Sequence, residues 1–381
     1  MTEPEQLSMQ LSAPTKTINP VGDFQNTPLK NPNNKWMVRS ALQKAVRRRD
    51  LPTALNTGGR LFATDEAYFW KSMAIIAIED VAFGDTEGSI IALRSTRKTY
   101  LKSRAITLGV TNADMAIHLI TRLTLAIKTR ICCEIALPND LTPMVSSEEK
   151  ETTLALLKEI STDTELTFDF TLKDLREDLT LAYRLTVLAN GKAYDLKEER
   201  PLKNLKALNH LLDLCRPEDL ELLNECLSTP IDSMMAAAIP ASMLLRQIGD
   251  DITIQKDPEF APPVEVFKGL PDYALDMHTR AGKMAINTLY HQHKEEYPVL
   301  QDMGKPSSGL GAVLFVLEGG VCDQRMRNPL LDGAKLWQDE TFIKSYGQYS
   351  GDVEALYTVI KQPHVQKKLA NLRAWAFHKE S

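Results

Sequence analysis

Apolar residues recur every three or four positions through most of the chain, a spacing typical of amphipathic helices. In the segment 40–49, Leu42 and Val46 share one helical face, whereas the cations Lys44 and Arg47 fall mostly on the opposite face. A second helix is expected to run to about Leu61. A third helix then carries an apolar ladder through the following residues to about 81.

The same periodicity predicts helices along the rest of the chain, with short breaks between them. The ranges are 87–102, 114–128, 172–189, 202–214, 217–226, 232–249 and 273–293, followed by short helical segments to the end. Residues 166–172, reading LTFDFTL, alternate between apolar and polar side chains and predict a short strand. We therefore expect a mainly α protein, a multi-helix array with at most a short β-hairpin.

Length and composition predict two or three domains. The chain has 381 residues, of which 43% are hydrophobic, enough for a sizeable core. Residues 1–34 are polar and contain Pro and Asn without periodicity, which predicts a flexible N-terminal tail. We expect a helical domain at 35–137, an inserted helical unit at 138–265 and a C-terminal helical domain at 266–381.

Charge and cysteine usage favour a reduced, soluble, cytoplasmic protein. The formal net charge is −5, and no apolar run approaches the ~20 residues of a membrane span, so no membrane partner is expected. The first residues lack the basic and apolar regions of a secretion signal. The five cysteines match no zinc-binding spacing, and His291 and His293 diverge on a helix, so we expect neither a metal nor a cofactor.

An acidic pair stands near the end of the third predicted helix. Glu79 and Asp80 occur where the helix dipole disfavours carboxylates, so the pair needs a partner. That partner is a Lys or Arg from a neighbouring helix, or the N-terminus of another helix. The pair can therefore be a structural ion pair or cap, or a part of a functional site.

The stretch from Ser40 to Asp85 resembles the helical C-terminal region of the MgsA/RarA family. These are clamp-loader-like ATPases that include the Werner-helicase-interacting protein. The resemblance is carried by SALQKAVRRRD, the two-helix pattern after it and the acidic turn IEDVAFGD, and it is thinner through Arg130. In that family the region follows an ATPase core and helps it to oligomerise. The resemblance thus implies work on DNA, with replication or repair proteins and further copies of the chain as partners.

The chain lacks the ATPase core of that family. It contains no G-x-x-x-x-G-K-[ST] phosphate-binding loop, and the nearest string, Gly282-Lys283, has no glycine at the right distance upstream. The resemblance therefore implies DNA association without an ATP-driven motor, and it transfers no catalytic residue.

A basic stripe on the predicted helix 87–102 is the main candidate for DNA contact. Arg94, Lys98 and Lys102 follow one another at every fourth residue, and cations so placed attract a phosphate backbone. The alternative is a solvated basic face. The complete set of predicted DNA-binding residues is Arg47, Arg48, Arg94, Arg97, Lys98, Lys102, Arg104, Lys128 and Arg280.

The segment 273–293 concentrates groups that could carry chemistry. On a helix, Asp276, Arg280 and Lys283 would share one face, with His278 partly aside. The structural alternative is an Asp–Arg ion pair within the helix, which stabilises by about 0.3–0.5 kcal/mol.

Excision of a base from DNA is the chemistry that these groups could perform. A carboxylate of Asp276, Glu79 or Asp80 could stabilise positive charge on the sugar or activate water, with His278 as general acid. A desolvated Lys283 could instead form a Schiff base with the sugar carbon. The base would have to be extruded and stacked on an aromatic ring. The predicted stacking residues are Tyr273, Trp70 and Trp36.

Three functions remain open at this point. The first is a DNA-binding protein of genome maintenance or of defence against foreign DNA such as phage. The second is a DNA glycosylase or lyase, for which Asp276→Asn should abolish turnover and leave folding intact. The third is a protein-binding oligomeric adaptor.

Overall fold

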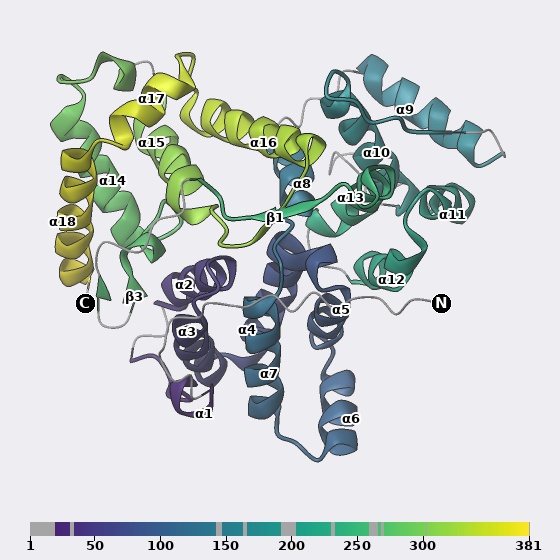
Figure 1. Ribbon diagram of the computed structural model, residues 1–381, viewed down its shortest axis with the longest axis horizontal. Coiled ribbons are helices and arrows are strands. Elements are labelled where there is room, and N and C mark those ends of the chain that lie inside the picture. The colour runs from purple at the N-terminus through teal and green to yellow at the C-terminus, as the bar shows by residue number, and fades with distance from the viewer. Residues whose placement is uncertain are drawn as a thin grey trace, which may run out of the picture.

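The computed structural model describes residues 20–30, 34–141, 147–162, 166–191, 203–229, 233–258, 266–267, 270–301 and 303–380. The described chain is mainly α, as predicted (Figure 1). Within it, strands occur as two short antiparallel pairs. β2 (Val266–Phe267) and β3 (Leu270–Pro271) form a hairpin, whereas β1 (Thr253–Gln255) pairs with the distant β4 (Arg325–Arg327).

The helices of the N-terminal third occupy the lower part of the molecule (Figure 1). Asp50, Asp65 and Asp85 each accept a backbone N–H from three residues later, which caps the first turns of the third, fourth and fifth helices. Their shared core includes Leu42, Leu55 and Phe69. The elements are α1 (Pro20–Asp23), α2 (Lys35–Arg47), α3 (Leu51–Thr64), α4 (Glu66–Ile76), the π-helical turn η2 (Ala77–Val81), the 3-10 turn η3 (Ala82–Gly84), α5 (Thr86–Arg94), α6 (Lys98–Leu108) and α7 (Asn112–Leu125).

The middle third forms a second helical layer around a larger core. This core also takes residues from the other two parts of the chain, among them Ile78, Leu244 and Leu331. The boundary predicted between residues 137 and 138 is therefore wrong, because it falls inside a helix that two cores share. The elements are α8 (Ile131–Leu141), α9 (Ser147–Ile160), α10 (Leu175–Ala189), α11 (Leu205–Asp213), η4 (Pro217–Asp219), α12 (Leu220–Ser228) and α13 (Met234–Ile248).

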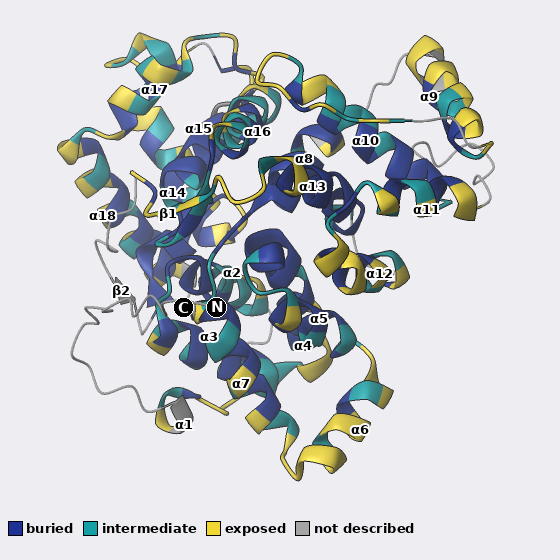
Figure 2. Cartoon of the chain, turned by 45° about the vertical axis from the view of Figure 1, so that its right-hand side comes forward, coloured by how far each residue is buried: buried dark blue, intermediate teal, exposed yellow. Residues whose placement is uncertain are grey.

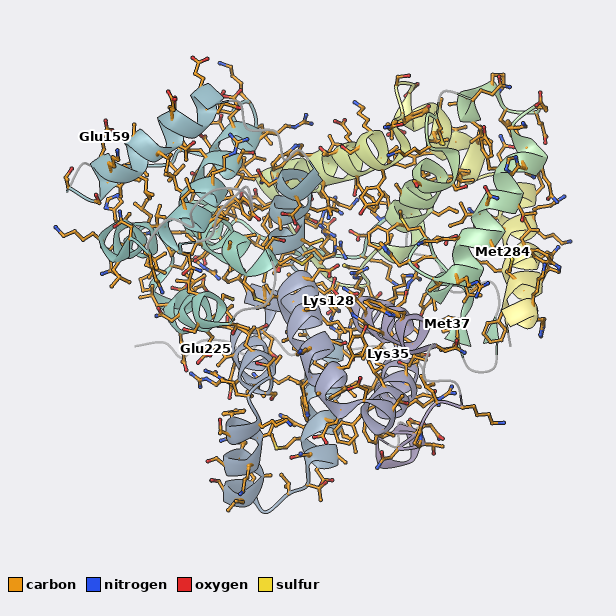
Figure 3. The ribbon with its side chains drawn as sticks, turned by 180° about the vertical axis from the view of Figure 1, so that it is seen from behind. Lys35, Met37, Lys128, Glu159, Glu225 and Met284 are labelled. Atoms are coloured by element: carbon orange, nitrogen blue, oxygen red, sulfur yellow. The ribbon has the colours of Figure 1, made fainter. Side chains whose placement is uncertain are left out.

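The C-terminal third packs α14 against α18 and α15 against α16. A third core lies between these helices, and a small cluster joins them to α2, where Met37 and Met284 pack (Figure 3). The elements are η5 (Asp272–Ala274), α14 (Arg280–His293), η6 (Pro298–Leu300), α15 (Pro306–Leu314), the π-helical turn η7 (Phe315–Gly319), α16 (Pro329–Gly347), α17 (Val353–Ile360) and α18 (Pro363–Glu380).

Two local predictions are wrong. The helix expected at 87–102 is broken after Arg94, where the hydroxyls of Ser95 and Thr96 bond to carbonyls of the preceding turn. No strand forms over 166–171, because the side-chain amide of Gln247 takes the place of a partner strand. It accepts from Phe170 N at 2.7 Å and donates to Phe170 O at 2.6 Å.

Part of the predicted tail is packed against the protein. Within 20–30, Phe24 and Leu29 are buried in the core of the N-terminal helices. The predicted flexibility of residues 1–19 lies outside the described residues. In the described part of the chain, no helix combines the length and the apolar character that a membrane span requires.

Candidate functional site

The polar face of α2 lines a cavity instead of facing solvent. Its residues recur three and four positions apart, so they lie on one side of the helix. They are Trp36, Arg39, Ser40, Gln43, Lys44 and Arg47. Because the opposite face packs into the core, α2 is covered on both sides, and its cations meet carboxylates from distant segments.

Arg47 pairs with both members of the acidic pair. Its Nη2 lies 2.6 Å from Glu79 Oε1 and its Nε 2.5 Å from Asp80 Oδ1, while its Nη1 donates to the carbonyl of Gly319. Arg130 Nη1 donates to the same oxygen, Asp80 Oδ1, at 3.0 Å. The expectation that the acidic pair takes a cation from a neighbouring helix is confirmed. Asp80 is fully buried beneath Glu79.

Lys44 forms the second buried ion pair of the site. Its Nζ donates to Asp276 Oδ2 at 2.6 Å, to the carbonyl of Tyr273 at 2.6 Å and to Ser40 Oγ at 3.0 Å, which uses all three of its N–H groups. Asp276 Oδ1 accepts the backbone N–H of His278. The ion pair joins α2 to a segment 232 positions later.

Burial and pairing shift the ionisation of these groups in opposite directions. Burial lowers the pKa of Lys44 to about 8, although Asp276 opposes this. Burial disfavours ionisation of Asp276 and Glu79, but Lys44 and Arg47 outweigh it, and the pKa of both carboxyls is lowered. The pKa of Asp80, the deeper carboxyl, is raised by burial and by the charge of Glu79. Asp276 and Glu79 are therefore ionised at neutral pH.

The cavity beside these ion pairs has a volume of about 240 Å³. The polar side chains of the lining are Arg39, Gln43, Glu79 and His278. The lining also contains an apolar, largely aromatic set, here called the aromatic wall, which is formed by Leu137, Met234, Phe315, Phe342 and Tyr346, with Cys133 beside them. Such a wall and a few convergent polar groups are typical of ligand-binding pockets, and the volume suits a ligand smaller than most drugs.

His278 stands exposed at this cavity, with its ring edge-on to Phe315. Its pKa lies below the usual value because the surrounding protein displaces water, an effect that Asp276 opposes. The imidazole is thus neutral at neutral pH, and it is suited to accept a proton. The predicted role of general acid requires that the imidazole first take up a proton.

Two π-helical turns border the cavity, η2 with Glu79 and η7 with Phe315. π turns are rare and often occur at functional sites. Ala82, directly after η2, has a φ of 39° and a ψ of −104°, a conformation that alanine rarely adopts. Backbone strain of this kind clusters at binding and catalytic sites, so it is consistent with a function for the cavity.

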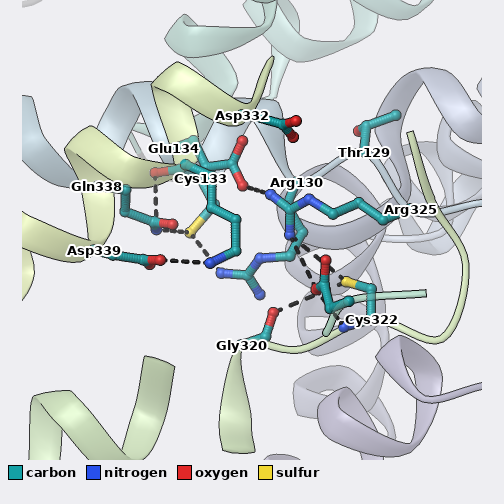
Figure 4. Close-up of polar contacts among 12 residues, drawn as sticks. Thr129, Arg130, Cys133, Glu134, Gly320, Cys322, Arg325, Asp332, Gln338 and Asp339 are labelled. Atoms are coloured by element: carbon teal, nitrogen blue, oxygen red, sulfur yellow. Dashed lines mark hydrogen bonds and ion pairs between the residues drawn. The ribbon is translucent and has the colours of Figure 1, made fainter. Parts of the chain in front are cut away.

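A second buried polar network adjoins the cavity through Cys133 (Figure 4). Cys133 Sγ accepts from Arg130 at 3.4 Å and from Gln338 at 3.0 Å, and Arg325 pairs with Glu134. Burial raises the pKa of Cys133 to about 12, so this thiol is neutral and a poor nucleophile. The network joins α8, β4 and α16 next to the cavity.

The predicted catalytic residues converge only in part. Asp276, His278 and Glu79 meet at the cavity, and Asp80 lies beneath it. Lys283 is exposed and does not line the cavity, so a desolvated Lys283 is wrong. Lys44 is the buried lysine of the site.

Asp276, Arg280 and Lys283 do not share one face of a helix, so this prediction is wrong. α14 begins at Arg280, and Thr279 Oγ1 accepts from Gly282 N as its N-cap. Asp276 lies in the preceding turn. Because Asp276 is half of a buried ion pair, we expect Asp276→Asn to destabilise the fold as well as to change the site.

Several predicted DNA-binding cations are unavailable for phosphate contact. Arg47, Arg48 and Lys128 are buried, and Lys128, central in Figure 3, donates to carbonyls at the end of α7. Arg94 and Arg97 pair with Glu225 of α12, at 2.7 and 2.5 Å. For Arg47, Arg48 and Lys128 the prediction of surface contact is wrong. The exposed members of the set are Lys98, Lys102, Arg104, Arg280 and the ion-paired Arg97.

Of the predicted stacking residues, one is accessible. Trp36 is 55% exposed at the rim of the cavity. Trp70 packs in a core, and Tyr273 lies beneath the guanidinium of Arg48, 4.4 Å from its ring centre, so neither can stack a base.

Sequence reasoning missed Arg39, Gln43 and Lys44 as site residues. Their signal is the polar face of α2, of which the sequence predicts only Arg47 for DNA contact. Phe315, Phe342 and Tyr346 carried no signal, since their role depends on how distant helices meet at the cavity.

Comparison of the chain with protein-family models, curated proteins and solved structures finds no match. The resemblance to the MgsA/RarA family accordingly stays an expectation. Among the described residues, no three His, Cys, Asp or Glu side chains are grouped so that they could hold a metal ion.

Proposed function

We propose that the protein binds DNA and takes a single base into the cavity between α2 and α16. The observation that carries this proposal is that aromatic and polar side chains line the same cavity. An extruded base needs stacking on its faces and hydrogen bonds at its edge, which these two kinds of side chain can supply. The exposed ring of Trp36 at the rim supports the proposal further.

Exposed cations on α6 support contact with the DNA backbone. Lys98, Lys102 and Arg104 are exposed on this projecting helix, which contains no acidic residue (Figure 2). Each cation can neutralise a phosphate and release a counterion.

The triple variant Lys98→Ala, Lys102→Ala and Arg104→Ala is expected to weaken DNA binding and to flatten its salt dependence. The slope of log K against log salt should fall by about 0.9 for each phosphate that the variant no longer neutralises. Fluorescence anisotropy with a labelled duplex at several salt concentrations measures both quantities. An unchanged slope would mean that α6 presents only a solvated basic face.

Base extrusion can be measured directly with duplex and single-stranded DNA that contains 2-aminopurine. The fluorescence of this base depends on what it stacks on, so transfer from the DNA stack to the aromatic wall should change the signal at saturation. Trp36→Ala should alter this change, whereas Lys283→Ala, an exposed change outside the cavity, should not. DNA binding without any fluorescence change would exclude the base pocket, and absence of DNA binding would leave the adaptor function.

Excision of the base is a second candidate function, favoured by the position of neutral His278 beside ionised Asp276. In this reaction the bond from C1′ to the base nitrogen breaks, and its electrons leave with the base. The oxygen of a water molecule bonds to C1′ while His278 accepts the proton and then passes it to the base. The carboxylates of Asp276 and Glu79 would stabilise positive charge on the sugar.

For this second candidate, His278→Ala is expected to slow excision by about 10²- to 10⁴-fold, because it removes the proton acceptor. DNA affinity and thermal stability should stay close to those of the parent, since His278 is exposed. Strand breaks after alkali treatment of ordinary and base-modified DNA measure the rate. If the parent protein leaves all of these substrates intact, excision is excluded and base binding alone stands.

A further inference from the structure

Arg39 is the cation of the cavity that lacks a carboxylate partner. Of the neighbouring arginines, Arg47 pairs with Glu79 and Asp80, and Arg48, directly after α2, donates to the carbonyl of Glu318. Within the described residues, no ion pair involves Arg39, and its buried Nε has no hydrogen-bond partner. An unpaired guanidinium next to a cavity is the arrangement that an anionic group satisfies.

The charges around the cavity leave an excess of one cation. Arg39, Lys44, Arg47 and Arg130 carry four positive charges. Glu79, Asp80 and Asp276 carry three negative charges when ionised. Because Lys44, Arg47 and Arg130 are used in pairs, the excess is located on Arg39.

The position of Arg39 places this charge toward the rim. Its guanidinium carbon lies 5.7 Å from the ring centre of Trp36, the exposed residue of the rim. A cation stacked on an aromatic ring is held in place without losing its charge. An anion at Arg39 would thus sit at the mouth, while the aromatic wall and Glu79 remain deeper.

We infer that the cavity takes a base together with an adjoining phosphate group, with Arg39 as the phosphate-recognition residue. This inference rests on the proposed base pocket and names its ligand class, a nucleoside monophosphate unit, either free or within a strand. The ring packs against the aromatic wall, the carboxylate of Glu79 accepts from an amino or ring N–H of the base, and the guanidinium of Arg39 binds the phosphate oxygens. Glu79 is an acceptor only, so bases with an exocyclic amino group are favoured.

The test is calorimetric titration of the full-length protein with the four deoxynucleoside monophosphates, the matching nucleosides and inorganic phosphate. A hydrogen bond between charged groups is worth enough for a monophosphate to bind about tenfold or more tighter than its nucleoside. Arg39→Ala should abolish this difference between monophosphate and nucleoside. Lys283→Ala should preserve the difference, as the matched loss of an exposed cation.

Each other result overturns the inference. Equal affinity for nucleoside and monophosphate, or a difference that survives Arg39→Ala, removes phosphate recognition by Arg39. Inorganic phosphate that binds as tightly as the monophosphates shows a general anion site. Thermal unfolding of Arg39→Ala is measured in parallel, and Arg39→Lys, which keeps the charge, should retain part of the preference if the variant Arg39→Ala is unstable.

The inference and the proposed function fail separately. Monophosphate binding without base extrusion from DNA would refute the proposed DNA function. It would still support a nucleoside monophosphate as the ligand of the cavity. A 2-aminopurine signal of base extrusion that does not depend on Arg39 would support the proposed DNA function. It would refute phosphate recognition by Arg39.

Discussion

Replacement of Arg47 by methionine is expected to lower the free energy of unfolding by about 3–5 kcal/mol. Methionine fills similar space, but it leaves Glu79 without its cation and removes one of the two guanidinium groups that bind Asp80. Asp80 is fully buried, so water cannot replace the donor that it loses. Chemical denaturation followed by circular dichroism measures the change.

Arg104→Met on α6 is the matched control, because Arg104 is exposed. It should change the free energy of unfolding by less than about 0.5 kcal/mol. Equal stability of Arg47→Met and the parent would show that the ion-pair cluster does not stabilise this fold.

Replacement of Gly282 by alanine is expected to destabilise the protein by about 1–3 kcal/mol or more and to disturb the site. A Cβ at this position would lie 1.9 Å from the carbonyl oxygen of Asp276 and 2.6 Å from its backbone nitrogen. A backbone cannot rotate away as a flexible side chain can, so the turn with Asp276 has to move. Displacement of that turn would separate Asp276 from Lys44.

The measurement for Gly282→Ala combines thermal unfolding with calorimetric titration of the deoxynucleoside monophosphates. Gly320→Ala serves as the control, since its Cβ would meet nothing closer than 3.4 Å. If Gly282→Ala unfolds at the same temperature as the parent and binds ligand equally well, the close contact between α14 and the Asp276 turn is not required.

Local chemistry made parts of the site predictable. Glu79 and Asp80 at a helix end predict a cationic partner, and the concentration of polar residues around Asp276 and His278 predicts a functional site. The helix predicted through Asp276 and the strand predicted at 166–172 are wrong because hydrogen bonds formed by single side chains change the local structure. Thr279 caps α14 and excludes Asp276 from the helix, and Gln247 replaces a strand partner.

The sequence by itself determined the mainly α class and the position of most helices, because apolar periodicity and capping residues act within a few positions. It also determined that α2 carries a polar face rich in cations. Only the tertiary structure decided what that face meets. Lys44 and Asp276 are separated by 232 positions, and packing of α2 against η5 brings them to 2.6 Å. Charge of a helix face is a local property, whereas burial of that charge depends on how distant segments pack.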